Sequence, residues 1–253
     1  MWEKDNYQNK HYSRAIVSAL MFEGSVDNDT IELIDDLLYV WYEHLSKNQL
    51  RRRYYEGENV LKDLGISIPP PLRNVETVVG WPKKAVSALA TRSIFDGYTC
   101  SDEEMAGQLD NIAKKAKLKR KYRQAVESEL IAGCDFITLS KGDKGEPPVV
   151  IVTHSAEDGA ATWDERQGRI KNGLVIMHYD DSGAPDEIAL YTDLETLHVD
   201  ASNGGFFVER LSHKMGRPMM EALSYNPSES EPFGQSRINR AVRSITDSAV
   251  RES

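Results

Sequence analysis

Two groups of histidine and carboxylate residues have the types and spacing that could hold a metal ion. His178 lies beside Asp180 and Asp181, and His154 lies just before Glu157 and Asp158. Imidazole nitrogens and carboxylate oxygens are common ligands of zinc and related metals. Both groups fall where predicted strands end at turns, however, and Asp side chains at turns commonly accept hydrogen bonds from the local backbone. We interpret both groups as turn chemistry, and the rival hypothesis is a metal-dependent hydrolase that uses the first group.

Motifs for nucleophilic or phosphate chemistry are incomplete. The Gly-x-Ser at 234–236 lacks the second glycine and the preceding strand of a nucleophile elbow. The glycines of the segment 141–146 lack the spacing and the hydroxyl residue of a Walker loop, and they suit a hairpin turn instead. The two cysteines, Cys100 and Cys134, form no CxxC pair, and we expect free thiols in a reducing compartment. We therefore expect no catalytic residue, no cofactor and no metal.

A run of basic residues is the feature most typical of nucleic-acid binding. It comprises Lys114, Lys115, Lys117, Lys119, Arg120, Lys121 and Arg123. We place this run on one long helix from about residue 110 to 132, which Gly133 ends. Only Tyr122 adds an aromatic ring for base stacking, so we interpret the run as a solvated helix face or a salt-bridged subunit contact. The alternative is a nucleic-acid-binding protein that uses the basic helix 114–123.

The composition is that of an ordinary globular protein with an acidic balance. The chain has 253 residues, 40% of them hydrophobic, and a formal net charge of -9. An acidic chain is poorly suited to coat nucleic acid or to bind an anionic membrane surface, because phosphate binding needs an excess of Lys and Arg. No apolar run approaches the roughly 18 residues that span a bilayer, and the first ten residues lack a signal-peptide core. We expect a protein that is neither secreted nor inserted in a membrane.

The first elements that must position these side chains are helices. Asp29 and Glu32 fit a capping box, and a wide apolar stripe that includes Leu37 and Trp41 predicts a helix from residue 29 to about 50. The three arginines at 51–53 would complement the dipole at its C-terminal end. The polar segment 1–28 is expected to be an N-terminal arm, with a short apolar patch at 15–22 that forms a modest helix or docks on the protein.

A second helix is predicted after a proline-rich spacer. The prolines at 69–71 exclude helix and hold the chain extended, and Pro82 is suited to the first turn of a new helix. An apolar stripe that ends with Ile94 defines its packed face, and residues 96–97 close it. We interpret Trp41, Trp81 and Trp163 as core or interface anchors. A further capping box at Ser101 and Glu104 precedes the long basic helix.

From Cys134 onward the hydrophobic pattern changes to alternation, which predicts strands. We expect strands at 136–140, 149–154, 174–179, 187–192, 196–199, 205–211 and 219–223. The segment 155–171 is predicted to be a polar insertion with at most one helical turn. Strands this short and this closely spaced predict an antiparallel meander.

The C-terminal segment is predicted to be a connector followed by a helix. Residues 225–236 are rich in Pro and Ser, and Ser236 can cap a helix that continues to about Val250. The fold class is therefore α+β, with N-terminal helices packed on an antiparallel sheet. The expected parts are an arm at 1–28, a helical part at 29–133, a sheet part at 134–224, and the connector with its helix at 225–253.

Several short segments occur in the order found in one known family. They are YYEG at 54–57, LGISIPPPLR at 64–73, VVGWP at 78–82, Arg92 with FDGY at 95–98, AVESELIAG at 125–133, GDKGEP at 142–147 and FGQSRINRAV at 233–242. Together they resemble the phage portal proteins of the SPP1 Gp6-like family. Each piece is modestly specific alone, and their shared order over roughly residues 45–250 makes the case.

The resemblance implies a fold and a mechanical function. The helical and sheet parts would form the wing region of a portal, and the last helix would be the start of its long stem. Trp81, Pro82 and Arg92 would hold the helical core, and Phe233, Gly234, Ser236 and Arg237 would set the turn into the stem. The chain has about half of the parts that the family leads us to expect, so we expect a shortened chain in which ring assembly and DNA passage are open questions.

The resemblance also implies partners. Portal subunits form a ring of about a dozen copies at one capsid vertex of the virion, and this ring is the head-tail connector through which DNA is packaged and ejected. The implied partners are further copies of the chain, the terminase large subunit, head-tail adaptor and capsid proteins, and double-stranded DNA in transient contact. Assembly would take place in the cytoplasm of the bacterial host. ATP hydrolysis belongs to the terminase, so the portal would not be an enzyme.

Overall fold

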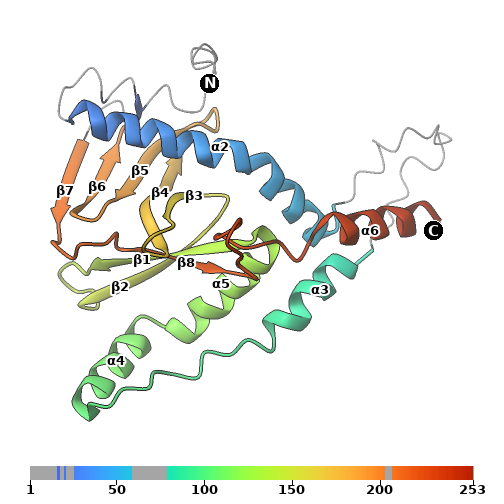
Figure 1. The fold of residues 1–253 in the computed structure, drawn as a ribbon, viewed down its shortest axis with the longest axis horizontal. Coiled ribbons are helices and arrows are strands. Elements are labelled where there is room, and N and C mark those ends of the chain that lie inside the picture. The colour runs from blue at the N-terminus through green and yellow to red at the C-terminus, as the bar shows by residue number, and fades with distance from the viewer. Residues whose placement is uncertain (1–15, 18–19, 21–25, 59–78, 203–206, 253) are drawn as a thin grey trace. The chain divides into compact units, whose positions relative to one another are not determined.

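The computed structural model describes residues 16–17, 20, 26–58, 79–202 and 207–252, and the chain divides into two compact units. Unit 1 comprises residues 1–46 and 136–222, and unit 2 comprises residues 47–135 and 223–253. The expected α+β class is confirmed, with helices, two antiparallel sheets and a C-terminal helix (Figure 1). Each unit is built from two segments that are distant in the sequence. The predicted division, with boundaries at residues 28, 133 and 224, assigned these segments to different parts.

A five-stranded antiparallel meander forms the larger sheet of unit 1. Its strands lie side by side in chain order: β3 (Gly159–Asp164), β4 (Arg169–Tyr179), β5 (Pro185–Tyr191), β6 (Glu195–Asp200) and β7 (Phe207–Ser212). The predicted strands at 174–179, 187–192 and 196–199 are confirmed. The predicted polar insertion at 155–171 is wrong, because it contains all of β3 and the start of β4. The alanines of β3 are nearly fully buried, so a strand of small residues fits where larger ones would not.

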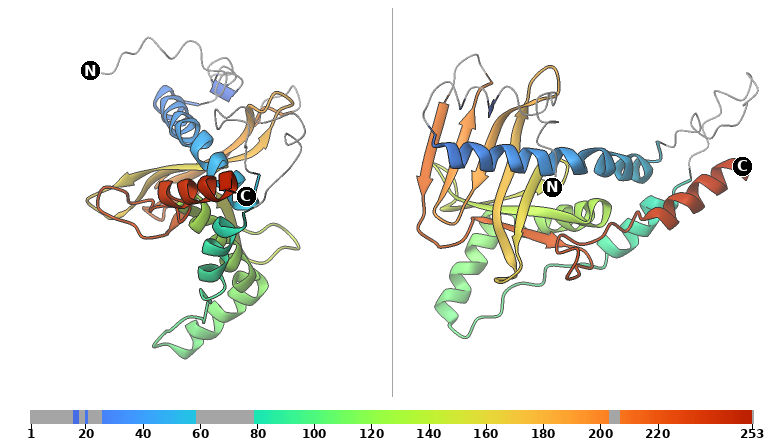
Figure 2. Two further views of the ribbon diagram at one scale, coloured as in Figure 1. Left: turned by 90° about the vertical axis from the view of Figure 1, so that its right-hand side faces the viewer. Right: turned by 45° about the horizontal axis from the view of Figure 1, so that its top comes forward.

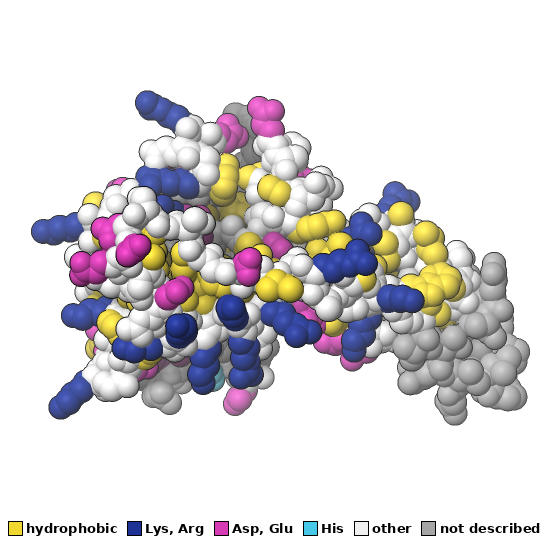
Figure 3. Space-filling view, turned by 90° about the horizontal axis from the view of Figure 1, so that it is seen from below, with side chains coloured by type: hydrophobic (Ala, Val, Ile, Leu, Met, Phe, Trp, Pro, Cys, Tyr) yellow, Lys and Arg dark blue, Asp and Glu magenta, His cyan; other side chains and the backbone are white. Residues whose placement is uncertain are grey.

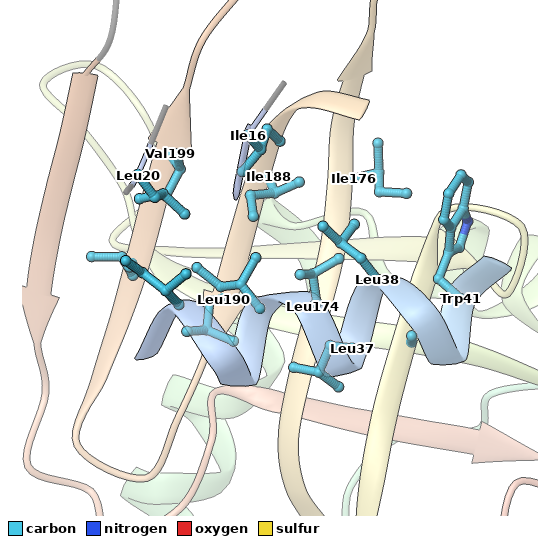
Figure 4. Packing of buried hydrophobic residues seen from close by; sticks show 14 of the residues in the cluster. Ile16, Leu20, Leu37, Leu38, Trp41, Leu174, Ile176, Ile188, Leu190 and Val199 are labelled. Carbon is cyan, nitrogen blue, oxygen red and sulfur yellow. The ribbon is translucent and has the colours of Figure 1, made fainter. Parts of the chain in front are cut away.

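Helix α2 (Asn28–Glu56) packs its first half on one face of this sheet. Leu37, Leu38 and Trp41 of α2 belong to one buried core with Leu174 and Leu190 of the sheet (Figure 4). The Trp41 indole N–H also donates a 2.6 Å hydrogen bond to the carbonyl of residue 157. The predicted apolar stripe is therefore confirmed as the core-facing side of the helix.

The N-terminal arm contributes to the same core. Ile16 and Leu20 are fully buried in this core, so the described residues of the apolar patch predicted at 15–22 pack on the protein (Figure 4). The predicted cap at Asp29 is wrong, because Asp27 caps α2: its carboxylate accepts 2.9 Å hydrogen bonds from the Thr30 backbone N–H and hydroxyl. Residues 27–29 are all Asp or Asn, and each of these residue types can cap a helix. Which one does so depends on where the first helical turn begins.

A three-stranded sheet covers part of the other face of the meander. It has the order β2 (Val149–Ser155), β1 (Cys134–Lys141) and β8 (Met220–Ser224). A Cβ at Gly159 would lie 2.6 Å from the Phe136 ring, and one at Gly173 would lie 2.2 Å from the Met220 sulfur. The missing side chain at Gly159 makes room for the Phe136 ring, and the one at Gly173 makes room for the Met220 side chain, so the two layers approach closely at both positions. The predicted hairpin between β1 and β2 is confirmed, with the turn at 142–148.

Besides the end of α2, unit 2 contains the helices α3 (Trp81–Ala90), α4 (Glu103–Lys115), α5 (Leu118–Ala132) and α6 (Arg240–Glu252) (Figure 2). The single helix predicted at 110–132 is wrong, because the chain breaks at Lys117, whose φ is 54°. The predicted extension of α3 to Ile94 is also wrong: the helix ends at Ala90, and Ile94 is 74% exposed. The predicted end of α5 at Gly133 is confirmed, with φ of 115°.

Two further caps lie one and three residues from the predicted positions. Asp102, not Ser101, caps α4 by accepting hydrogen bonds from the backbone N–H groups of residues 104 and 105. Asn239, not Ser236, caps α6 by accepting a 3.0 Å hydrogen bond from Val242 N–H. Ser236 has a different use, described below.

The core of unit 2 joins α3, α5 and the segment before α6. Its buried members are Val86, Ala90, Val126, Leu130, Ile131 and Ile238. The prolines at 69–71 and residues 1–15, for which an extended spacer and an arm were predicted, lie outside the described residues. In the described part of the chain, no helix is both long and apolar enough to cross a membrane.

Candidate assembly sites

The C-terminal end of α5 is the point on which distant segments of unit 2 converge. The last carbonyls of a helix have no partner within the helix and must be satisfied from elsewhere. Here the Leu130 carbonyl accepts from Arg237 N–H at 2.8 Å, and the Gly133 carbonyl accepts from Tyr225 N–H at 3.0 Å. The connector before α6 is therefore fixed to the end of α5 by its backbone.

Ser236 completes this junction with its side chain. Its hydroxyl donates to the Ile131 carbonyl at 2.5 Å and accepts from Ile238 N–H at 3.0 Å, and the residue is only 5% exposed. Ser236 and Arg237 were predicted to set the turn that precedes the last helix, and the structure places both in that turn. Arg237 acts through its backbone, while its side chain is exposed.

Two glycines make the close approach at this junction sterically allowed. Gly133 and Gly234 both have positive φ, at 115° and 75°. A Cβ at Gly234 would lie 2.4 Å from the Tyr225 carbonyl oxygen and 2.7 Å from the Gly133 carbonyl oxygen. Only glycine combines this conformation with this lack of space. Gly234 was predicted to belong to the turn, and its neighbour Phe233 is half-buried there.

Arg51 also belongs to this junction, a position that the sequence pattern did not identify. Its guanidinium donates a hydrogen bond to the Ala132 carbonyl at the end of α5, and also contacts Asn48 at 3.2 Å. We expected Arg51 to complement the dipole of its own helix, but that helix continues to Glu56. Arg51 instead places its charge at the negative end of α5. Burial lowers the pKa of its guanidinium below the ordinary value.

Tyr54 and Tyr55 tie the end of α2 to two other helices of unit 2. The Tyr54 hydroxyl donates a 2.8 Å hydrogen bond to Asp247 of α6, and the Tyr55 hydroxyl donates to Glu127 of α5. Burial, and then these carboxylates, raise the pKa of each tyrosine to about 12. Both tyrosines belong to the YYEG segment, which was predicted to matter only through the family resemblance. The adjacent aromatic residues near a helix end were the available signal.

The residues predicted to hold the helical core behave differently from one another. Pro82 is buried in the first turn of α3, as a core residue should be. Trp81 is 52% exposed and Arg92 is exposed, so the prediction that these two hold the core is wrong. Pro82 fits the first turn of α3 because a backbone N–H there would have no partner within the helix. The side chain of Trp81, at the preceding position, lies on the exposed side of the helix. A role for Trp81 in subunit assembly stays a prediction.

The basic run forms an elbow rather than a helix face. We define the basic elbow as residues 114–123: the end of α4, the left-handed turn at Lys117, and the start of α5. All of its Lys and Arg side chains are exposed except Lys121, which is half-buried. On the face seen in Figure 3, Lys and Arg side chains are spread over several parts of the surface, with hydrophobic and acidic side chains among them. The basic residues are therefore divided between two helices and the turn that joins them, and do not lie along one continuous helix.

The histidines of the possible metal groups have local partners. His178 Nδ1 lies 2.6 Å from the carboxylate of Asp186, which raises the pKa of the imidazole. Asp180 accepts hydrogen bonds from Ser182 and Ala184 of its own turn, which confirms the prediction of turn chemistry there. Within the described residues, no group of three or more His, Cys, Asp or Glu side chains is arranged to hold a metal ion.

His154 is half-buried in unit 1. Its Nε2 lies 3.0 Å from the Thr138 hydroxyl, and burial lowers the pKa of the imidazole to about 4. It is therefore a neutral histidine at ordinary pH, bonded across the β1–β2 hairpin. Glu157 and Asp158, its predicted partners, lie in the turn after β2, where their backbone carbonyls accept hydrogen bonds.

Comparison with known proteins identifies the family. Residues 34–249 match the family described as "Phage portal protein, SPP1 Gp6-like". The portal protein of Mycobacterium phage L5 is 25% identical over 215 residues, and that of Mycobacterium phage D29 is 26% identical over 213 residues. Each alignment covers 78% of this chain and 42% of the relative, so the chain spans less than half the length of these relatives. The match covers both described units and most of the chain, and the chain belongs to the SPP1 Gp6-like family of phage portal proteins.

Proposed function

We propose that this chain is a structural subunit of a portal ring, the head-tail connector through which DNA is packaged into the capsid and later ejected. The observation that carries the proposal is the family match from residue 34 to 249, which includes nearly every element of both units. The matching relatives are portal proteins of two phages. Unit 1 and most of unit 2 would form the wing, and α6 would begin the stem.

The proposed role is mechanical, and the chain's residues serve to hold its own parts and its neighbours in place. In this role the ring of about a dozen subunits makes or breaks no covalent bond, and the terminase supplies the ATP hydrolysis that moves DNA. The partners would be further copies of the chain, the terminase large subunit, adaptor and capsid proteins, and duplex DNA in passing. The subunit would reside at the portal vertex of the virion after assembly in the host cytoplasm.

The acidic balance is compatible with this role. A surface that neutralised many phosphates would hold DNA in place, because each neutralised phosphate releases a counterion and adds to affinity. A chain with net charge -9 can surround DNA that must slide. The proposal therefore predicts weak binding of duplex DNA that does not depend on its sequence.

The solution mass of the 253-residue chain tests the proposal. A ring of a dozen 28.5 kDa chains would scatter light as a species of roughly 340 kDa, and negative-stain images would show closed rings. Tight, salt-sensitive binding of duplex DNA by a monomer would count against the proposal. A chain that stays monomeric at every concentration would contradict ring formation by this chain.

A further inference from the structure

Helix α4 is a 13-residue helix with no buried residue. Its apolar side chains share one side, at the helical spacing of Met105, Leu109 and Ile112, and Met105 is 53% exposed. Short helices are marginal in water and depend on burial of an apolar stripe for their stability. Within the chain α4 contacts α5, but this contact leaves part of the stripe open. The helix therefore presents an apolar strip next to the basic elbow.

The basic elbow adds charge at the end of that strip. Lys114, Lys115, Lys119 and Arg120 are exposed around the left-handed turn at Lys117. Among the described residues, no carboxylate forms an ion pair with any of these four side chains. A surface that combines apolar groups with unpaired cations fits a partner that combines apolar groups with carboxylates.

Unit 1 carries a surface of that kind on β6 and β7. The meander faces α2 with Val199 and Val208, so the alternate residues of β7 point to the opposite face. There Phe207 is 57% exposed and Leu211 is 52% exposed, and Glu209 lies between them. We call this surface the outer face of β7; it lies on the edge strand of the sheet.

Carboxylates surround the apolar residues of the outer face. Glu209 lies opposite His198 in the ladder, and Asp200 lies opposite Phe207. His198 in turn pairs with Glu187 at 2.8 Å. An edge strand with exposed aromatic and aliphatic side chains is a site where another chain binds unless charge or cover prevents it.

The two units differ strongly in charge. Unit 1 contains 24 Asp and Glu against 11 Lys and Arg, a net charge of -13, whereas unit 2 contains 16 against 20, a net charge of +4. Closed rings need heterologous contacts, in which one surface of a subunit binds a different surface of the next. An acidic unit and a basic unit in one chain supply two surfaces that attract each other and repel their own kind.

We propose that α4 and the basic elbow of one subunit dock on the outer face of β7 of the neighbouring subunit. The apolar strip of α4 covers Phe207 and Leu211, and the elbow cations pair with Glu209 and its neighbouring carboxylates. The occupant of each surface is thus a second copy of this chain. This inference rests on the proposed ring and goes beyond it by naming the two surfaces that meet.

Disulfide trapping between two differently tagged chains tests the contact. One chain carries Lys119→Cys and the other Glu209→Cys, both in a Cys100→Ser background, so that a bond between these positions can form only between two molecules. We expect the mixed disulfide to form at least tenfold faster than in a matched pair that carries Lys144→Cys in place of Lys119→Cys. Lys144 is also exposed but lies in the β1–β2 turn. Equal rates for the two pairs would overturn the inference.

Charge reversal provides a second, independent test that requires no cysteine substitution and no cross-link. Lys119→Glu and Glu209→Lys should each weaken self-association at least tenfold in sedimentation velocity, and an equal mixture should restore it, because the reversed surfaces match each other. Lys144→Glu should have no such effect. No restoration in the mixture would contradict a direct contact between these two surfaces.

The outcomes separate this inference from the proposed function. Rings that form equally well with both reversals would refute the contact and leave the portal ring standing. An unmodified chain that neither associates nor cross-links would refute both. If Lys119→Glu abolishes binding to duplex DNA but leaves self-association unchanged, nucleic acid occupies the elbow and the inference is wrong.

Discussion

The junction at the end of α5 should be far less tolerant of a side chain at Gly234 than a glycine of similar conformation elsewhere. Gly234 and Gly183 both have positive φ, at 75° and 82°. Gly183 lies in the turn between β4 and β5, and a Cβ there would meet no atom within 4 Å. The two positions therefore share the same conformational strain and differ in the space available, which makes Gly183→Ala a matched control for Gly234→Ala.

The expected cost of each change follows from these two terms. An L-residue in the left-handed region costs about 1–2 kcal/mol relative to glycine, which applies to both variants. At Gly234 the new methyl group would also lie 2.4 Å from the Tyr225 carbonyl oxygen, a backbone atom that cannot rotate away. Relieving this clash would displace the hydrogen bonds at that carbonyl and at Gly133, at about 1 kcal/mol each. We expect a loss of about 3–4 kcal/mol for Gly234→Ala and about 1–2 kcal/mol for Gly183→Ala.

Urea denaturation, monitored by circular dichroism, measures the loss in free energy of unfolding for both variants. Gly97→Ala is a second control within unit 2, because Gly97 also has positive φ and open space around it. Light scattering on the folded variants then reports whether the junction affects assembly. Equal losses for Gly234→Ala and Gly183→Ala would refute the reasoning, since backbone conformation alone would then explain both.

Three further predictions concern the interiors of the two units. Burial lowers the pKa of the His154 imidazole to about 4 in the folded chain, whereas in the unfolded chain it is about 6.5. As the pH falls below about 6.5 the unfolded chain therefore takes up a proton before the folded chain does, and His154 should lower the free energy of unfolding by about 3 kcal/mol near pH 4. Urea denaturation at several pH values would measure this contribution, which should be absent in His154→Gln. Leu38→Ala should cost about 3 kcal/mol because Leu38 is fully buried, whereas Leu194→Ala, at a residue 64% exposed, should change the free energy of unfolding by less than about 0.5 kcal/mol. Tyr54→Phe should cost about 1–2 kcal/mol by leaving the Asp247 carboxylate without its donor, and an unchanged midpoint in urea would count against that hydrogen bond.

Alternating hydrophobic patterns predicted most of the sheet, because a strand with one buried face and one exposed face carries apolar residues at every second position. Strand β3 was missed because its sequence, GAATWD, is short and begins with Gly and Ala, which are poor strand formers. Its reason to be a strand lies elsewhere: Gly159 accommodates Phe136, and the small side chains fit between layers. Such a requirement depends on the partner layer and cannot be seen in the local sequence.

The errors at helix ends have a similar origin. The break at Lys117 carries no Gly, Pro or Asn signal, and a run of good helix formers surrounds it. Ala116 and Leu118, on either side, are both buried, which a continuous helix cannot achieve for residues two apart on one face. Tertiary packing therefore overrides propensity at this turn. Caps at Asp27, Asp102 and Asn239 were each missed by one to three residues, because neighbouring polar residues offered equally good side chains.

The junction at the end of α5 was foreseen only in part, and its chemistry explains why. Gly234, Ser236 and Arg237 were placed in the turn from the family resemblance, but the donor from Arg51 comes from a residue 81 positions away from its acceptor. A hydrogen bond between a guanidinium and a backbone carbonyl leaves no pattern in the acceptor's sequence, since every residue has a carbonyl. The contact becomes visible only in three dimensions.

The convergence at α5 gives a physical meaning to the short segments that carried the family resemblance. YYEG supplies the tyrosines that bind α5 and α6, AVESELIAG supplies the end of α5, and FGQSRINRAV supplies the glycine and serine that close the junction. Segments far apart in sequence thus form one set of contacts within unit 2. A change in any one of them should loosen the same structure, so Tyr54→Phe and Gly234→Ala should show a coupling energy above about 0.5 kcal/mol when combined, whereas Leu38→Ala, in the separate core of unit 1, should add independently to either.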